Sequence, residues 1–350
     1  MTSRAAIVPV PGDPFLFRYW IEKYDQYWSG EIDKLYVHIN TTAEVAVVNY
    51  MLYPISKRKD IEYIYTPHEI PHGEAIKQAL ERVKEKHIML IEDDALIFKR
   101  GKVSQMFEML ENGQYEVIGS KRGSCSKELI DATNALWNID NEEGYGDHGT
   151  NFWPCFFFCE TELLLKTDQH FDSKSYPQDQ PIKYLNGYMP REQLYSDTFV
   201  NTSLQIHQLV PQSKILYEPQ YHSYVSDEED QTNRRNIFDG RAAWLHIGSL
   251  SSGVNGVLKD RNNRSLSKRL VLPPENETLI PNYVYSDMDR QEWTRRVSWW
   301  DRFYKTAKPT QEIQEYYDLY GEAIKRVQLA YGIHNKEILK RQAIFATLGL

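Results

Sequence analysis

Strand-like and helix-like segments alternate through the first hundred residues, and this alternation constrains the fold more than any other feature. Apolar, β-branched runs typical of strands occupy residues 5–10, 34–40, 61–66 and 87–93. The segments between them have helical character at residues 15–28, from residue 42 onward, and at residues 73–86. Strands separated by helices of about ten residues or more form βαβ units. The pattern therefore predicts an α/β fold around a parallel sheet.

The alternation continues, less regularly, into the second half of the chain. Further strands are expected at residues 115–120, 151–165 and 214–219, and a helix is expected at residues 195–210. The sheet is expected to extend to about residue 225. In a sheet of this kind, ligands bind at the carboxyl ends of the strands.

The residue composition of the sequence changes at Asn255. A basic stretch containing Gly, Asn and Ser follows, and an apolar helical stripe runs from Ile313 to Val327, after which Asn335 is suited to cap a last helix. We therefore expect a main domain at 1–254, a basic loop or linker at 255–285 and a helical C-terminal subdomain at 286–350.

Composition narrows the class of protein. The longest apolar runs, such as residues 152–159, are far shorter than the roughly 20 residues of a membrane span. Prolines interrupt the first apolar segment, so we do not expect it to act as a secretory signal. We expect a soluble, cytoplasmic protein without a membrane partner. The net charge of −8 weakens, without removing, a nucleic-acid interpretation. Three cysteines, Cys125, Cys155 and Cys159, are expected to be buried reduced thiols.

Three acidic residues, Glu92, Asp93 and Asp94, follow directly after the apolar run at 87–91. Adjacent carboxylates at the end of a buried strand repel one another, and a divalent cation removes that repulsion. Carboxylate oxygens suit Mg²⁺ or Mn²⁺, which also bind substrate phosphates. The alternative is a solvated acidic turn, or the first residues of a helix, where acidic side chains are favoured.

The segment HGEAIKQALERVKEKHIMLIEDDALIF, residues 72–98, resembles the part of GT-A fold glycosyltransferases in which a helix leads into a strand ending in the acidic DXD motif. The resemblance covers about residues 5–250 and implies a Rossmann-like, mixed but mainly parallel sheet flanked by helices. It also implies that Asp94 binds the metal and that Glu92 and Asp93 assist, facing ribose or metal-bound water. His246, in AWLHIGSLSSG, matches the histidine that many such enzymes bring back to the metal, although a hydrogen-bonded core histidine is the alternative.

The same resemblance implies a nucleotide-sugar donor, most simply a UDP-sugar, and a set of residues around it. The donor-binding residues are expected to be Pro9, Pro11, Asp13, His72, Gly73 and Lys77, in addition to Glu92 and Asp93. Lys77 would meet the diphosphate as a charge-assisted partner, and its alternative is a solvated position on a helix.

A base for the attacking hydroxyl is expected in REQLYSDTF, residues 191–199. Asp197 lies where inverting members of the family carry their catalytic acidic residue, and Glu192 is the reserve candidate. An aspartate at that point could accept the hydroxyl proton. The alternative is that Asp197 or Ser196 only caps a helix.

A narrower resemblance indicates which acceptor the enzyme would use. VPVPGDPFLFRYWIEKY and DKLYVHIN are similar to the viral and base J-type glucosyltransferases that modify hydroxymethylated pyrimidines in DNA. The walls of the acceptor site are expected to include Lys121, Arg122 and Trp153. Phosphate contacts are expected from the basic residues Lys259, Arg261, Arg264, Lys268 and Arg269, and base stacking from the tryptophans near Arg295, which are Trp293, Trp299 and Trp300.

Other functions stay open at this point. A glycan or a protein would serve equally well as acceptor, because aromatic platforms also bind sugars. A nucleotidyltransferase could use the same carboxylates with two metals. A non-catalytic sugar-binding module is a third alternative, and the released product distinguishes the three.

Overall fold

The structure is a computed structural model of the 350-residue chain. It describes residues 3–11, 13–41, 45–66, 70–121, 126–137, 151–218, 244–247, 293–294, 297–298, 301 and 311–348.

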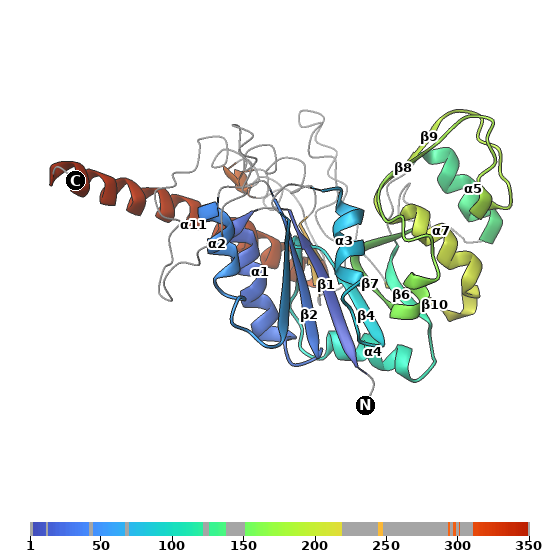
Figure 1. The fold of residues 1–350 in the computed structure, drawn as a ribbon, viewed down its shortest axis with the longest axis horizontal. Helices are drawn as coiled ribbons and strands as arrows, with labels where there is room; N and C mark the ends of the chain where they lie inside the picture. The colour runs from blue at the N-terminus through green and yellow to red at the C-terminus, as the bar shows by residue number, and fades with distance from the viewer. Residues whose placement is uncertain are drawn as a thin grey trace.

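A seven-stranded, mainly parallel sheet forms the centre of the molecule, as the sequence predicts (Figure 1). Its order is β10-β6-β7-β4-β1-β2-β3, and only β7 runs antiparallel to its neighbours β4 and β6. The strands are β1 Arg4–Val10, β2 Lys34–Asn40, β3 Ile61–Thr66, β4 His87–Ile91, β6 Val117–Lys121, β7 Phe152–Glu160 and β10 Ile215–Glu218.

Both faces of the sheet's central strands are buried, and successive side chains of these strands enter opposite cores. In β1, Ala6 and Val8 pack with α1, α2, α4 and α11, whereas Ala5 and Ile7 pack with α3, α6 and α7. This explains why the strands read as continuous apolar runs instead of alternating with polar residues. The helices are α1 Pro14–Tyr27, α2 Val45–Leu52, α3 His72–Leu80, α4 Lys102–Glu111, α6 Thr161–Leu165, α7 Val200–Leu209 and α11 Gln311–Thr347.

Several boundaries differ from the sequence prediction. Helix α3 ends at Leu80 rather than near residue 86, because the chain turns there, with Val83 N donating to Leu80 O, to enter β4. The strand expected at 151–165 ends at Glu160, and its last five residues form α6. The last described strand of the large sheet ends at Glu218, and residues 219–243 lie outside the described part of the chain.

A small lobe beside the large sheet was not predicted. Strands β8 Lys174–Tyr176 and β9 Leu194–Ser196 form an antiparallel pair, and α5 Lys127–Trp137 packs beside them in a separate apolar cluster (Figure 1). The helix expected at 195–210 consequently begins only at Val200, because residues 195 and 196 belong to β9 and Phe199 is the N-cap.

The C-terminal residues form one long helix rather than two. Asn335, expected to cap a last helix, lies inside α11 and is buried, so that prediction is wrong. The first part of α11 packs against α1, whereas Figure 1 shows its far end, in red, extending away from the sheet. No helix among the described residues is long and apolar enough to cross a membrane. Cys155 and Cys159 are buried free thiols, as predicted, and Cys125 lies outside the described residues.

Candidate metal and donor site

The carboxyl ends of the parallel strands meet along one edge of the sheet. Three of the predicted site segments lie along this edge. They are the β1–α1 loop with Asp13, the turn after β4 with Glu92 to Asp94, and the end of β6 with Lys121. Because β7 runs antiparallel, Trp153 near its start reaches the same edge. The topology therefore brings together residues that the sequence analysis assigned separately to metal, donor and acceptor.

His246 is delivered to the acidic turn by a second, two-stranded sheet. Strand β5, Ala95–Ile97, pairs antiparallel with β11, Trp244–His246, so that His246 stands opposite Ala95. The pairing extends one residue further, where Ile247 N donates to Asp94 O at 2.9 Å. Trp20 of α1 holds the other side of this turn, since its Nε1 donates to Ala95 O at 2.8 Å.

The side chains of Glu92, Asp94 and His246 form a compact group whose ligand atoms all lie within 4.8 Å of one another. His246 Nε2 lies 3.3 Å from Glu92 Oε2 and 3.2 Å from Asp94 Oδ1. Two ligands bound at about 2.1 Å to one small divalent cation are roughly 3.0–3.4 Å apart. The donor set of two carboxylates and an imidazole therefore fits such a cation in chemistry and in spacing.

Burial adds to the case for a cation. The exposed fractions of the side chains are 12% for Glu92, 8% for Asp94 and 1% for His246. Asp93 lies beside them and is also buried. Burial, reinforced by the charges of Asp94 and Glu92, raises the pKa of Asp93 well above its usual range. A concentration of carboxylates with so little access to water is stabilised by a positive ion.

Trp153 packs against the proposed metal ligand. Its ring meets the His246 ring edge-on, with 4.8 Å between centroids. Trp153 is half-buried, so part of its surface is accessible at the edge of the sheet. Trp153 is expected in the acceptor wall from the sequence, and that role stays a prediction. Its contact with His246 was not foreseen, because it depends on the pairing of β11 with β5.

Asp13, expected near the ribose, is a buried N-cap of α1. Its Oδ1 accepts from Phe15 N and Leu16 N, both at 2.9 Å. Its Oδ2 accepts from Trp293 Nε1 at 3.1 Å and from Tyr331 Oη at 2.8 Å. The donor-binding role of Asp13 stays a prediction, as do those of Pro9, which is buried in β1, and Pro11, which is half-buried in the loop.

The loop and helix before β4 contain the other residues expected to bind the nucleotide-sugar donor. His72 and Lys77 are half-buried on α3. Gly73 is buried, and a Cβ there would overlap the backbone of Phe171 and Asp172. Its amide donates to Asp172 Oδ1 at 2.6 Å. Close packing thus explains why position 73 is a glycine, and its role in binding the donor nucleotide stays a prediction.

The two candidate bases lie near the small lobe. Asp197 is half-buried just before α7, and its Oδ1 accepts from Thr198 N at 2.8 Å. The N-cap position of α7 is Phe199, with φ of 71°, and no side chain caps this helix, so neither Asp197 nor Ser196 occupies that position. Phe199 N donates to Phe171 O at 2.6 Å, which ties this segment to the residues that contact Gly73. Glu192 is exposed.

Much of the expected acceptor site lies outside the described residues. This applies to Arg122 and to the basic residues Arg261, Arg264, Lys268 and Arg269. Trp293 is described and is fully buried beside Asp13. The expectation that Trp293 stacks on an extruded base is therefore wrong, because its indole belongs to the core.

Comparison with known proteins gives likenesses to solved structures. No protein-family model matches the sequence, and no curated protein matches it. The chain is similar to S. aureus TarS 1–349 in complex with UDP-GlcNAc, with 11% identity, 48% of each chain covered and a TM-score of 0.33. The match thus spans about half the length of that TarS chain.

Two further structures show similar values. The mannosyltransferase PcManGT from Pyrobaculum calidifontis, in complex with GDP-Man and Mn²⁺, shares 10% identity over 99% of this chain and 79% of its own, with a TM-score of 0.39. Glucosyl-3-phosphoglycerate synthase from Mycobacterium tuberculosis shares 12% identity over 62% and 69%, with a TM-score of 0.40. These likenesses carry no inference about activity, and the proposed function rests on the side chains of this chain.

Proposed function

We propose that the protein is a metal-dependent glycosyltransferase that moves a sugar from a nucleotide-sugar donor, most simply a UDP-sugar, to a hydroxyl group. The observation that carries this proposal is the convergence of Glu92, Asp94 and His246 from two distant segments at the carboxyl edge of the sheet. Each of these residues has a plain alternative when taken alone. A single cation bound by all three side chains explains their close spacing more simply than three separate structural roles do.

Glu92, Asp94 and His246 would hold Mn²⁺ or Mg²⁺, and the imidazole favours Mn²⁺ of the two. When bound, the ion neutralises the charge that develops on the diphosphate leaving group. The β5–β11 pair keeps the ligands close together without the ion, because His246 is fixed by backbone hydrogen bonds. The apolar residues around it, including Trp244 and Leu245, exclude water from that side of the group.

Asp197 is proposed as the base that accepts the proton of the attacking hydroxyl, with Glu192 in reserve. Two features support Asp197 over Glu192. It is half-buried where Glu192 is exposed, and it precedes Phe199, whose left-handed backbone holds a costly conformation. Direct in-line attack assisted by such a base inverts the configuration of the sugar.

Metal coupling tests the site. We expect calorimetry to show that Mn²⁺ strengthens UDP binding at least tenfold, because the clustered carboxylates of Glu92 and Asp94 repel the diphosphate when no cation is bound. Asp94→Asn should remove most of this coupling. Asp131→Asn, which changes an exposed carboxylate paired with Lys127, is the matched control and should leave it intact. Equal UDP affinity with and without Mn²⁺ in the unaltered protein would refute the site.

Product analysis tests the reaction class with the same proteins. A glycosyltransferase releases nucleoside diphosphate from a nucleotide sugar, a nucleotidyltransferase releases pyrophosphate from a triphosphate, and a binding module releases neither. In this assay, Asp197→Asn should retain donor binding, and its rate of sugar transfer should fall about 10²- to 10⁴-fold. Near-normal turnover would assign the base to another residue, with Glu192 the next to change.

For the acceptor, we propose 5-hydroxymethylpyrimidine in double-stranded DNA. Its support is the sequence resemblance together with the basic residues between Lys259 and Arg269, all outside the described residues. The test is incubation with a panel of nucleotide sugars, Mn²⁺, and either hydroxymethylated DNA or glycans, followed by intact-mass analysis. A mass gain on a glycan and none on DNA would end the DNA proposal and leave the glycosyltransferase proposal standing.

A further inference from the structure

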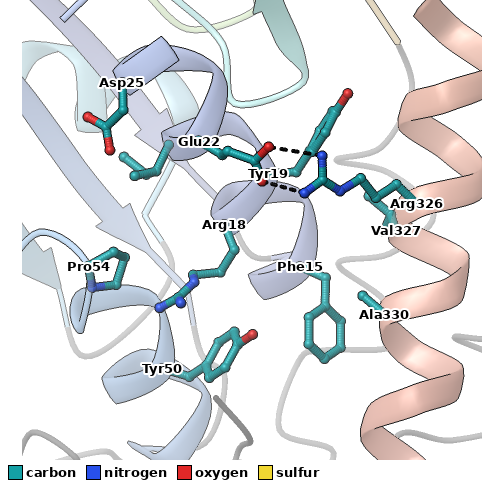
Figure 2. A pocket seen from close by; sticks show the side chains of 11 residues that line it. Phe15, Arg18, Tyr19, Glu22, Asp25, Tyr50, Pro54, Arg326, Val327 and Ala330 are labelled. Carbon is teal, nitrogen blue, oxygen red and sulfur yellow. Dashed lines mark hydrogen bonds and ion pairs between the residues drawn. The ribbon is translucent and has the colours of Figure 1, made fainter. Parts of the chain in front are cut away.

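A pocket of about 370 Å³ opens between α1, α2 and α11, apart from the metal group (Figure 2). Its lining combines charged and aromatic side chains with an apolar floor. The lining residues are Phe15, Arg18, Tyr19, Ile21, Glu22, Asp25, Tyr50, Pro54, Arg326, Val327 and Ala330. None of them is a proposed ligand of the metal or a residue proposed for the transfer reaction.

Three of the four charged side chains that line the pocket are paired. Arg326 forms a bidentate pair with Glu22, at 2.9 and 2.6 Å, which Figure 2 shows as two dashed lines. Asp25 accepts from Arg58 Nη1 at 2.6 Å. Arg18 is the exception, since its guanidinium has no hydrogen bond or ion pair with any residue in the described part of the chain.

The position of Arg18 is nevertheless well defined. Its guanidinium carbon lies 4.9 Å from the centroid of the Tyr50 ring and 5.8 Å from that of Tyr53. Cation–π contacts of this kind leave the N–H groups at the edge of the guanidinium available to an acceptor. The Nη1 atom is buried and has no acceptor among the described residues. Leaving a buried, charged donor without an acceptor is costly, so the arrangement favours an anion from outside.

We propose that this pocket binds a small organic anion, with a carboxylate or phosphate group on Arg18 and an apolar body along the rest of the lining. The guanidinium matches both acid groups, because its planar fork donates two parallel hydrogen bonds to either. The site is independent of the proposed transferase activity, and its failure would leave that activity untouched.

The remaining lining defines the body of the ligand. Phe15, Val327 and Ala330 form an apolar wall opposite Arg18 (Figure 2). The Tyr50 ring lies under the Arg18 guanidinium and contacts the Phe15 ring, with 5.6 Å between ring centroids. The volume is at the lower end of the range for small-molecule sites, which is about 300–1,000 Å³. The Glu22–Arg326 pair closes one side and leaves little net charge there. A single acid group on a flat apolar body therefore fits better than a polyanion.

The experiment uses the full chain in EDTA, so that no metal can hold an anion at the acidic turn. Benzoate and phenyl phosphate are titrated by calorimetry, and inorganic phosphate serves as the probe without an apolar body. We expect saturable binding of at least one aromatic probe, competition between the two where both bind, and weaker binding of inorganic phosphate. The stronger aromatic probe identifies which acid group the site prefers.

Two variants and a control assign the binding to Arg18. Arg18→Gln removes the charge and should weaken the bound probe at least tenfold, whereas Arg18→Lys keeps the charge without the fork and should weaken it less. Arg82→Gln changes an exposed arginine outside the pocket and should have no effect. Without any probe, Arg18→Gln should lower the Tm only slightly, because the contacts it loses are the cation–π contacts with Tyr50 and Tyr53.

Two outcomes would overturn the proposal. One is equal probe affinity in the parent and Arg18→Gln. The other is the absence of saturable binding by all three probes in the parent protein.

Discussion

At the scale of single residues, Asp13 shows how one carboxylate joins distant parts of the chain. It accepts four hydrogen bonds, two from the first turn of α1 and two from Trp293 and Tyr331, which is on α11. Burial nevertheless raises the pKa of Asp13 to about 6, because the loss of hydration outweighs these donors. The sequence indicated a polar residue at a strand end and could not indicate which donors would surround it.

This raised pKa gives a pH dependence of defined sign. The folded state holds the Asp13 proton more tightly than the unfolded chain, so the residue's contribution to stability is full below its ordinary pKa and is lost as pH rises through about 6. We expect the free energy of unfolding of the parent, relative to Asp13→Asn, to fall by up to about 3 kcal/mol between about pH 4 and about pH 7.

Urea denaturation of both proteins in EDTA measures this difference. Asp131→Asn, at an exposed position, is the control for carboxylate loss in general and should give a much flatter curve. A parent-minus-variant difference that rises with pH would mean that the four donors, and not burial, dominate at Asp13.

At the scale of elements, the sequence predicted the strands better than the connections between them. Strands β1, β2 and β4 follow from apolar runs that are buried on both faces, and the acidic turn after β4 follows from its position at a strand end. The pairing of β11 with β5 brings His246 to that turn, and only the family resemblance suggested it. The β8–β9 pair was missed because its strands have three residues each, too few for a periodic pattern.

The docking of α3 provides a test at this scale. Gly73→Ala should lower the free energy of unfolding by roughly 1–3 kcal/mol, because the new methyl group overlaps the backbone of Phe171 and Asp172. That backbone has little freedom to move, since Phe171 O accepts from Phe199 N. Gly332→Ala in α11 is the matched control, because a Cβ there has no neighbour within 4 Å, and it should be neutral or stabilise by up to about 1 kcal/mol.

The same pair of variants separates packing from donor binding at Gly73. Unchanged stability in Gly73→Ala, combined with weaker UDP binding, would assign the glycine to the donor alone. Thermal or urea unfolding and UDP calorimetry on both variants provide the two measurements.

At the scale of the whole molecule, α11 links the C-terminal residues to the main core. Tyr320, Ile324, Val327 and Tyr331 of α11 belong to the same apolar cluster as the strands β1 and β2. The sequence predicted the apolar stripe to Val327 but not that the helix continues past Asn335. The boundaries of the three proposed units stay a prediction, because residues 255–285 lie outside the described part of the chain.

A packed α11 implies that the helix and the main domain unfold together. Ile324 is fully buried, so Ile324→Ala should cost about 2–5 kcal/mol and shift the whole unfolding curve, because the lost side chain leaves a cavity in the shared core. Leu339→Ala, on the exposed far part of α11, is the matched control and should change stability by less than about 0.5 kcal/mol. Unfolding is followed by tryptophan fluorescence, to which five tryptophans of residues 1–254 and three of residues 286–350 contribute, and by far-ultraviolet circular dichroism. If Ile324→Ala produced an early helical transition while the fluorescence midpoint stayed fixed, α11 would belong to a separately folding subdomain.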